Sequence, residues 1–308
     1  MKRSFFQTLV ELAEHDERIH LLVGDLGFSV VEEFARRFPS RFVNAGVAEQ
    51  NMTGMAAGIA MCGGTVFTYS IGNFATLRCL EQIRNDVCHP ELNVKVVAAG
   101  GGLAYGSLGA SHHATEDLAV MRALPNMTVV APGDEYEVKQ ATRAIASHAG
   151  PCYLRLGRVE NRRVHVGEPA FTLGKAIKLK DGDDVAIVST GEMLEDVLSV
   201  ADSLAAQGVK ATVLSMHTVK PLDEQALLEA AGKTRAIVTV EEHSLLGGLG
   251  GAVAEVLAEA RLPSLRFKRL GLPPLFCHEV GDQEYLKKRL GLSRPDIAKS
   301  IVSLLSRE

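Results

Sequence analysis

Short runs of β-branched residues alternate with helical patterns along the whole chain, and this alternation limits the fold more than any other feature. The runs expected to form strands lie at 20–23, 94–98, 128–130, 153–156, 185–188, 211–214 and 236–240. The clearest helical patterns lie between them, at 5–14, 48–61, 135–147 and 193–206. Strand–helix–strand alternation produces parallel sheets covered by helices on both faces. The sequence therefore predicts an α/β fold.

One segment interrupts this alternation. Residues 157–171 are charged, include Pro169 and have no apolar period, as is typical of a linker. A chain of 308 residues also has room for about two domains. We therefore expect two α/β domains at 1–158 and 170–308, each a mainly parallel sheet flanked by helices, with a linker at 159–169.

Composition excludes several classes of protein. With 33 Lys and Arg against 37 Asp and Glu, the formal charge is −4, which does not favour nucleic acid as a partner. Five cysteines without a CxxC pair indicate reduced thiols in a cytoplasmic protein. Glu11 and Glu14 interrupt the first apolar residues too early for a signal peptide. The longest weakly polar stretch, 52–67, is too short to span a membrane, which takes roughly 20 residues.

The helix expected at 48–61 is apolar on both faces, which predicts burial on all sides. A single acid, Glu49, opens it. The helix dipole favours a negative charge at this position, whereas burial opposes it. An ordinary exposed first-turn acid is the alternative interpretation of Glu49.

An ordered set of motifs resembles the transketolase superfamily. Its first half contains Gly24-Asp25-Leu26-Gly27, Ala48-Glu49-Gln50-Asn51-Met52, Tyr69-Ser70-Ile71-Gly72-Asn73-Phe74, Ser111-His112-His113 and Arg155-Leu156-Gly157-Arg158. This half resembles the pyrimidine-binding domain. Residues 170–308, with Val240-Glu241-Glu242-His243, resemble the C-terminal domain. The resemblance covers essentially the whole chain.

The resemblance implies thiamine diphosphate as the cofactor and assigns residues to it. Glu49 matches the acid that hydrogen-bonds a nitrogen of the cofactor's aminopyrimidine ring. Phe74 matches the aromatic residue that stacks on this ring. Arg78, expected on the same helical face at i, i+4, is a candidate for lining the same pocket. Asp25 either reaches the cofactor or only caps its turn.

The resemblance also implies substrate contacts. His112 matches the histidine that contacts the reacting carbonyl and hydroxyl groups, so Glu49 and His112 are the candidate catalytic residues. His113 is either a second relay on the substrate or a mere neighbour. Arg158 matches the arginine that binds substrate phosphate. However, 100–105 lacks the basic residue expected there, which leaves open whether the sugar is phosphorylated.

The domain that binds the cofactor's diphosphate is missing, since the chain has no Gly-Asp-Gly motif. The resemblance therefore implies a split transketolase whose N-terminal partner subunit supplies the Mg²⁺ ligands, in a heterotetramer. No metal ligands are expected here. Glu241-Glu242-His243 is set aside as a metal site, because neighbouring strand residues point to opposite faces.

The implied reaction is transfer of a two-carbon ketol unit from a ketose to an aldehyde. Three alternatives remain: the beta subunit of a 2-oxoacid dehydrogenase decarboxylating component, a deoxyxylulose-phosphate-synthase-like enzyme, and a catalytically silent binding subunit. The presence of Glu49, Phe74 and His112 together favours an enzyme.

Overall fold

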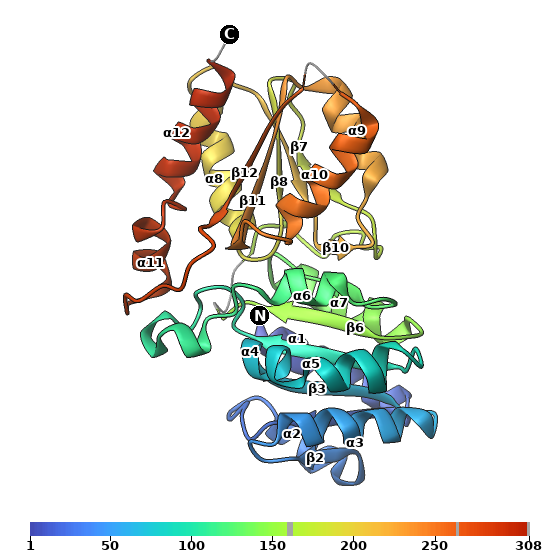
Figure 1. The fold of residues 1–308 in the computed structure, drawn as a ribbon. Helices are drawn as coiled ribbons and strands as arrows, with labels where there is room; N and C mark the ends of the chain where they lie inside the picture. The colour runs from blue at the N-terminus through green and yellow to red at the C-terminus, as the bar shows by residue number, and fades with distance from the viewer. Residues whose placement is uncertain (159–162, 263–264, 307–308) are drawn as a thin grey trace.

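The computed structural model describes residues 1–158, 163–262 and 265–306 and confirms the α/β fold (Figure 1). It contains two mainly parallel sheets, one of seven strands and one of five. In Figure 1 the sheet of the N-terminal half lies below, in blue and green, and that of the C-terminal half lies above, in yellow to red. No helix among the described residues is both long and apolar enough to cross a membrane.

The larger sheet has the strand order β10-β5-β6-β4-β3-β1-β2. Its strands are β1 (Ile19–Val23), β2 (Phe42–Asn44), β3 (Thr65–Ile71), β4 (Val94–Ala99), β5 (Thr128–Val130), β6 (Cys152–Leu156) and β10 (Thr218–Lys220). All pairs are parallel except that of β10 with β5. The carboxyl ends of the parallel strands therefore meet at one edge of the sheet.

Helices cover both faces of this sheet. The N-terminal half contains α1 (Lys2–His15), α2 (Glu32–Arg37), α3 (Glu49–Met61), α4 (Gly72–Ala75), α5 (Leu80–Gln82), α6 (Asp117–Ala123) and α7 (Glu135–Ser147). Side chains of α1 and α7 pack on one face, and those of α3 and α6 pack on the other. A π-helix at Ile83–Cys88 continues α5 on the α3 side.

The smaller sheet has the order β12-β11-β8-β9-β7. Its strands are β7 (Ile177–Lys180), β8 (Val185–Ser189), β9 (Ala211–Ser215), β11 (Ala236–Ser244) and β12 (Arg266–Leu272). The helices are α8 (Met193–Ala205), α9 (Glu224–Lys233), α10 (Leu249–Ala260), α11 (Gln283–Arg289) and α12 (Arg294–Leu305). α8, α11 and α12 contribute to one core, and α9 and α10 contribute to the core on the opposite face.

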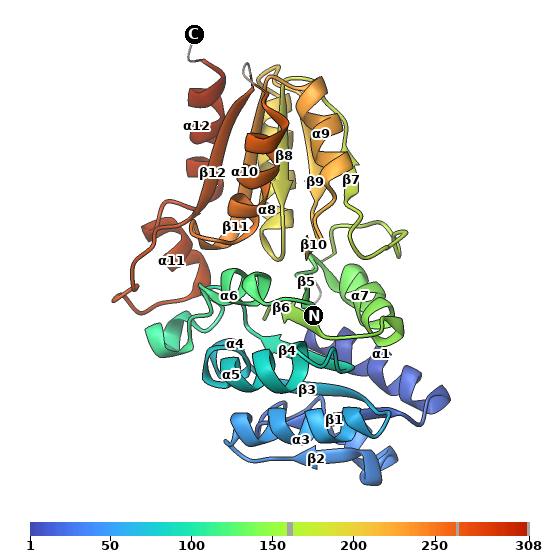
Figure 2. The ribbon, with the colours of Figure 1, turned by 45° about the vertical axis from the view of Figure 1, so that its right-hand side comes forward.

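The two halves share one element of structure. β10 comes from the C-terminal half of the chain, yet it pairs with β5 and forms the edge of the larger sheet (Figure 2). Of the predicted linker, residues 159–162 lie outside the described residues. Its remainder packs against α7, since the amides of Val164 and His165 donate to Asp134, the N-cap of that helix.

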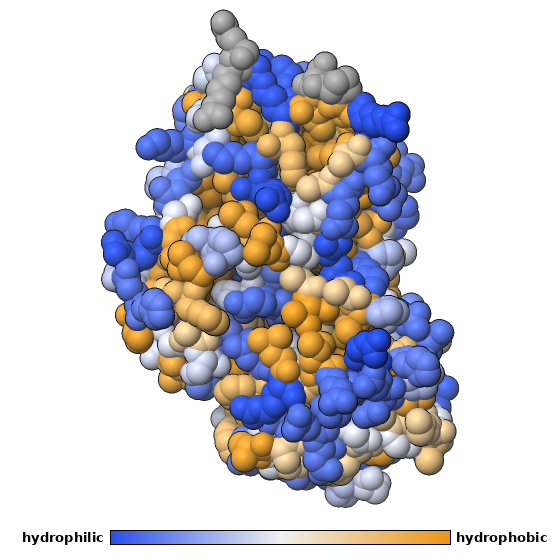
Figure 3. Space-filling model, in the orientation of Figure 1, coloured by the Kyte–Doolittle hydropathy of each residue, from blue (hydrophilic) through white to orange (hydrophobic). Residues whose placement is uncertain are grey.

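The expectation that the helix beginning near residue 48 is buried on all sides is wrong for this chain. α3 buries Met52 and Ala56 but exposes Gly54, Gly58 and Met61. Beyond Gln50 and Asn51 in the first turn, the exposed residues are two glycines and a methionine, which is why the sequence pattern resembles that of a fully buried helix. Other apolar side chains are also exposed, as the orange areas of Figure 3 show. Leu77, Leu275 and Phe276 are among the exposed apolar residues.

Candidate active site

The candidate residues gather at the carboxyl edge of the larger sheet. Asp25 follows β1, Phe74 follows β3, and the loop with His112 follows β4. Arg158 follows β6, and these four strands are direct neighbours in the sheet. Open α/β sheets bind ligands outside the carboxyl ends of their strands. The topology alone therefore places these residues on one side of the molecule.

Glu49 opens α3 with its side chain directed into the protein, so that the residue is only 1% exposed. Ser70 Oγ donates to Glu49 Oε1 at 3.0 Å, and Arg78 Nη1 donates to Oε2 at 2.7 Å. Gly24 allows this approach, because a Cβ there would lie 3.2 Å from Oε1. A buried carboxylate is tolerated when it is paired and hydrogen-bonded in this way.

Arg78 and Phe74 meet, but not through the helix predicted for them. α4 ends at Ala75, and Thr76 separates it from a short 3-10 helix at Leu77–Cys79. The hydroxyl of Thr76 donates to Gly72 O at 2.7 Å and closes the last turn. Arg78 Cζ nevertheless lies 4.2 Å from the centroid of the Phe74 ring, a cation–π contact.

His112 lies on the other side of Phe74. The two ring centroids are 5.2 Å apart, with an interplanar angle of 65°. Ser111 Oγ lies 3.0 Å from His112 Nδ1 and orients the imidazole. Glu49, Arg78, Phe74 and His112 therefore form one continuous row of contacts.

Tyr105 extends this row towards Arg158. Its ring centroid is 6.5 Å from that of His112, and Arg158 Cζ lies 5.1 Å from the Tyr105 ring. Arg158 also donates to Ala104 O at 3.1 Å. Burial raises the pKa of Tyr105, so its hydroxyl remains a neutral donor. The exposed guanidinium of Arg158 thus lies at the far end of the row from Glu49.

His113 makes none of the ring contacts that His112 makes with Phe74 and Tyr105 among the described residues. Its ring lines a cavity of about 300 Å³ between the two halves of the chain, whose lining also includes Leu103, Leu272 and Phe276. Burial is the main cause of its lowered pKa, and its Nε2 has no hydrogen-bond partner among the described residues. The adjacent histidines therefore face different environments.

Asp25 lies at the rim of the edge and is exposed. Asn44 Nδ2 donates to Asp25 Oδ1 at 2.9 Å, and the Asp25 amide donates to Asn44 Oδ1 at 3.1 Å. Asp25 adopts φ +53°, a left-handed conformation that short polar side chains tolerate. Among the described residues, no hydrogen bond or ion pair joins the Asp25 side chain to Glu49.

Sequence reasoning missed three residues of this site. Ser70 holds Glu49, Tyr105 connects His112 to Arg158, and Asn44 fixes the turn of Asp25. Ser70 and Asn44 both stand at or next to carboxyl ends of strands, which is a usable signal. For Tyr105, the only signal in the sequence was its position in a glycine-rich loop.

Two family models match the chain. The model described as "Transketolase, pyrimidine binding domain" matches residues 1–163, and that described as "Transketolase, C-terminal domain" matches 174–297. Among curated relatives, a putative transketolase C-terminal section of Methanocaldococcus jannaschii is 42% identical. This match covers 100% of the chain and 97% of the relative.

Two relatives carry more specific names. A 6-deoxy-6-sulfo-D-fructose transketolase subunit of a Clostridium species is 41% identical over 100% of the chain and 95% of its own length. A subunit of an apulose-4-phosphate transketolase of Phocaeicola vulgatus is 36% identical over 99% of the chain and 97% of its own length.

Solved structures agree with these matches. A structure described as a split gene transketolase in an inactive beta4 tetramer matches with a TM-score of 0.89 at 40% identity, over 98% of this chain and 97% of its own. A Campylobacter jejuni transketolase has the same fold, with a TM-score of 0.82 at 21% identity, over 98% of this chain and 46% of its own. The chain therefore belongs to the transketolase family and corresponds to the C-terminal section of its split members.

Proposed function

We propose that this chain is the C-terminal subunit of a thiamine-diphosphate-dependent split transketolase. With an N-terminal partner subunit, it transfers a two-carbon ketol unit from a ketose to an aldehyde acceptor. The observation that carries the proposal is the row from Glu49 through Phe74 to His112, at the sheet edge where this family binds its cofactor. The names of the relatives, each a subunit of a transketolase, support a divided enzyme.

The residues present fit the pyrimidine end of the cofactor. Glu49 supplies a buried carboxyl oriented by Ser70, and Phe74 supplies a half-buried aromatic face nearby. Glu49 would hold a ring nitrogen of the aminopyrimidine while Phe74 packs on the ring. When bound, thiamine diphosphate supplies the carbon nucleophile and the electron sink of the reaction.

His112 acts on the substrate in this proposal. Its imidazole lies beside Phe74, and Ser111 Oγ contacts its Nδ1. The remaining nitrogen, Nε2, can donate a proton to a carbonyl oxygen or accept one from a hydroxyl, as general acid–base catalysis requires. Tyr105 and Arg158 continue beyond His112 and bind the distal end of the sugar.

The distal end of the substrate carries an anion in this proposal. Two relatives are named for sugars with a phosphate or a sulfo group. Arg158 presents an exposed guanidinium at the end of the row, and guanidinium groups bind such anions bidentately. His113 faces the cavity between the two halves, so we propose that it supports the loop rather than touching the sugar.

The N-terminal partner completes the site. Among the described residues, no three His, Cys, Asp or Glu side chains converge to hold a metal ion. We propose that the partner binds the diphosphate and Mg²⁺ and that two chains of each kind form a cytoplasmic heterotetramer. The five cysteines, all unpaired, suit a reducing compartment.

The second candidate function is that of a deoxyxylulose-phosphate synthase. A 1-deoxy-D-xylulose-5-phosphate synthase of Geobacter sulfurreducens is 36% identical over 98% of this chain and 47% of its own length. In this case pyruvate would replace the ketose donor. The two activities therefore differ in a donor that can be supplied directly.

The test is reconstitution with the N-terminal partner, thiamine diphosphate and Mg²⁺. We expect transfer from ketose donors to aldehyde acceptors, and a loss of at least about 100-fold in turnover for Glu49→Ala. Glu229→Gln, an exposed change on α9, is the matched control and should retain activity. Full activity of Glu49→Ala would contradict the proposal. Turnover with pyruvate as the donor and an aldehyde as the acceptor, in the absence of a ketose, would favour the synthase.

A further inference from the structure

The loop that carries His112 is closed at its base. The backbones of Gly102 and Ala114 pair with each other in an antiparallel bridge, with N–O distances of 2.8 and 2.9 Å. The segment 103–113 between them contains Tyr105, His112 and His113. The position of His112 over Phe74 therefore depends on what holds this base.

A side chain from the other half of the molecule holds one strand of the base. Glu242, on β11 of the smaller sheet, accepts a hydrogen bond from the amide of Leu103 at 2.6 Å. Gln283 Nε2 donates to both oxygens of the same carboxylate, at 3.0 and 2.9 Å. Glu242 is itself buried, so its carboxyl group depends on these protein donors.

Arg155 holds the other strand of the base. Its Nη2 donates to Ala114 O at 2.9 Å and to the backbone oxygen of Glu242 at 3.0 Å. Its Nε donates to Asp117 Oδ2 at 2.8 Å. One guanidinium thus joins the loop base to β11.

The glycines of the loop base permit this approach. A Cβ on Gly101 would lie 2.3 Å from Arg155 Nε, and one on Gly102 would lie 2.4 Å from Glu242 Oε1. Neither glycine has room for a side chain, and Gly102 also has φ +63°. The two side chains therefore enclose the loop base from both sides.

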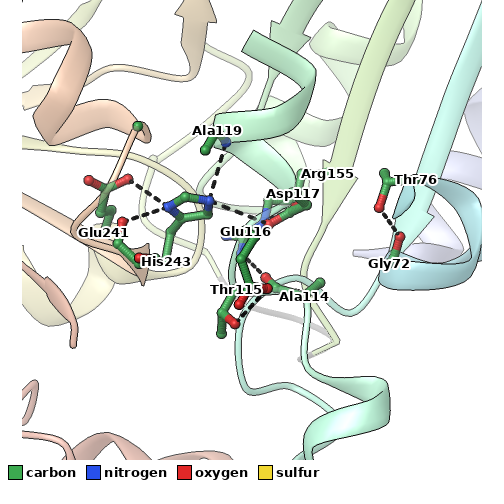
Figure 4. Close-up of polar contacts among 12 residues, drawn as sticks. Gly72, Thr76, Ala114, Thr115, Glu116, Asp117, Ala119, Arg155, Glu241 and His243 are labelled. Atoms are coloured by element: carbon green, nitrogen blue, oxygen red, sulfur yellow. Dashed lines mark hydrogen bonds and ion pairs between the residues drawn. The ribbon is translucent and has the colours of Figure 1, made fainter. Parts of the chain in front are cut away.

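Glu241 and His243, on either side of Glu242 in β11, make different contacts. Glu241 accepts hydrogen bonds from the amides of Leu249 and Gly250, at the start of α10. Among the described residues, no hydrogen bond or ion pair joins it to the loop. His243 lies between Glu241 and Asp117 (Figure 4), and its Nε2 accepts a bond from the Ala119 amide at 3.3 Å. Glu242 is therefore the acid of this strand that reaches the loop.

We propose that Glu242 is a positioning residue for His112, because its carboxyl group fixes the base of the 103–113 loop from the C-terminal half. Its catalytic consequence rests on the function proposed above, whereas its structural consequence does not. The C-terminal half thereby contributes to the active site without touching cofactor or substrate. Glu242 acts only through the Leu103 amide and the backbone that follows it.

Amide hydrogen exchange on the full chain tests the structural part. Glu242→Ala should speed exchange of the Leu103 amide and of the 103–113 segment by about 10-fold or more, since a lost hydrogen bond of this kind corresponds to about that factor. Glu242→Gln keeps an oxygen acceptor and should remain within about threefold of the unaltered chain.

Glu241→Ala is the matched control, because this acid is also buried and lies on the same strand. It should speed exchange at Leu249 and Gly250 while leaving the 103–113 segment unchanged. Unchanged loop exchange in Glu242→Ala, or equal loop loosening in Glu241→Ala, would overturn the proposal.

Kinetics of the reconstituted complex test the catalytic part. Glu242→Ala should lower kcat by about 10-fold while KM for the ketose stays within about threefold, and Glu242→Gln should restore most of kcat. A rise in KM alone would overturn the positioning role. If the unaltered complex transfers no ketol unit, the proposed function fails, while the exchange result still decides how Glu242 holds the loop.

Discussion

Arg78 lies 2.7 Å from the buried carboxylate of Glu49 and covers it with a planar cation. The same guanidinium lies over the ring of Phe74. It therefore makes both contacts that we assign to an aminopyrimidine ring: a hydrogen bond to the acid and packing on the aromatic face. A bound aminopyrimidine ring must therefore displace the Arg78 guanidinium. The Arg78 side chain is 42% exposed and has space to move.

The Arg78–Glu49 pair should be energetically coupled. We expect a double-mutant cycle with Arg78→Met and Glu49→Gln to give a coupling free energy of about 1–2 kcal/mol, since one partner is buried and the other is partly solvated. Urea unfolding of the four proteins measures it. The exposed pair Arg289–Glu279 is the control and should give a clearly smaller coupling, because solvent screens it. Equal couplings would show that burial of Glu49 adds nothing.

His112 and His113 should differ in kinetics despite being neighbours. His112→Ala should lower kcat/KM by about 100-fold, because its imidazole contacts Phe74 in the row of candidate site residues. His113→Ala should cost less than about tenfold, because its ring lines the cavity between the halves. Steady-state kinetics of the reconstituted complex and calorimetric titration with thiamine diphosphate separate turnover from cofactor affinity. A collapse of cofactor affinity in His112→Ala would show that this histidine belongs to the cofactor pocket instead.

Glu242 should make folding stability depend on pH. Burial, and then the nearby Glu192, raises its pKa to about 7 from the usual 4.5. Between pH 4.5 and about pH 7, the folded chain therefore keeps a proton on Glu242 that the unfolded chain has released. Stability from this proton is therefore complete below pH 4.5 and is lost as pH rises through 7.

Glu242→Gln should accordingly gain stability relative to the unaltered chain as pH rises from about 5 to about 8, by up to about 3 kcal/mol. Urea unfolding at several pH values measures this difference. Glu279→Gln is the control: Arg289 and Tyr285 lower the pKa of Glu279 to about 2, outside this range, so its difference should stay flat. Parallel curves for Glu242→Gln and the unaltered chain would contradict the prediction.

Arg155 should be far more important for stability than a surface arginine. Arg155→Met removes the cation that pairs with the fully buried carboxylate of Asp117 and leaves it the hydroxyl of Tyr153 as a donor, which should cost about 3–5 kcal/mol in unfolding free energy. Arg122→Met removes a pair with the exposed Glu255 and should cost about 1 kcal/mol. Adding Asp117→Asn to Arg155→Met should recover part of the loss. Equal costs for the two single arginine variants would contradict this account.

The local pattern predicted the central elements well, because buried strands and amphipathic helices have strong apolar periods. The strands expected from the sequence do not include the central β3, and they do not include β2, β7, β10 and β12, which lie at sheet edges. An edge strand is only partly buried and so lacks a clear apolar run. β12 is an example, with Arg266, Lys268 and Arg269 along it.

The candidate site was predictable where one motif carried it and unpredictable where distant segments meet. Glu49 and Phe74 were identified from motifs, and the structure brings them together through Arg78. The pairing of Glu242 with Leu103 joins residues far apart in sequence, and no local pattern indicates it. The different surroundings of His112 and His113 depend on the backbone of one loop, which residue types alone do not specify.

The strand that the C-terminal half contributes to the larger sheet affects how the two halves can be produced separately. Because β10 closes the edge of the larger sheet beside β5, a fragment ending in the connecting segment would leave the β5 backbone without its neighbour. Such an uncovered strand readily recruits other chains. The N-terminal half expressed by itself should thus aggregate. A stable version of this half needs residues 218–220 or another strand in their place.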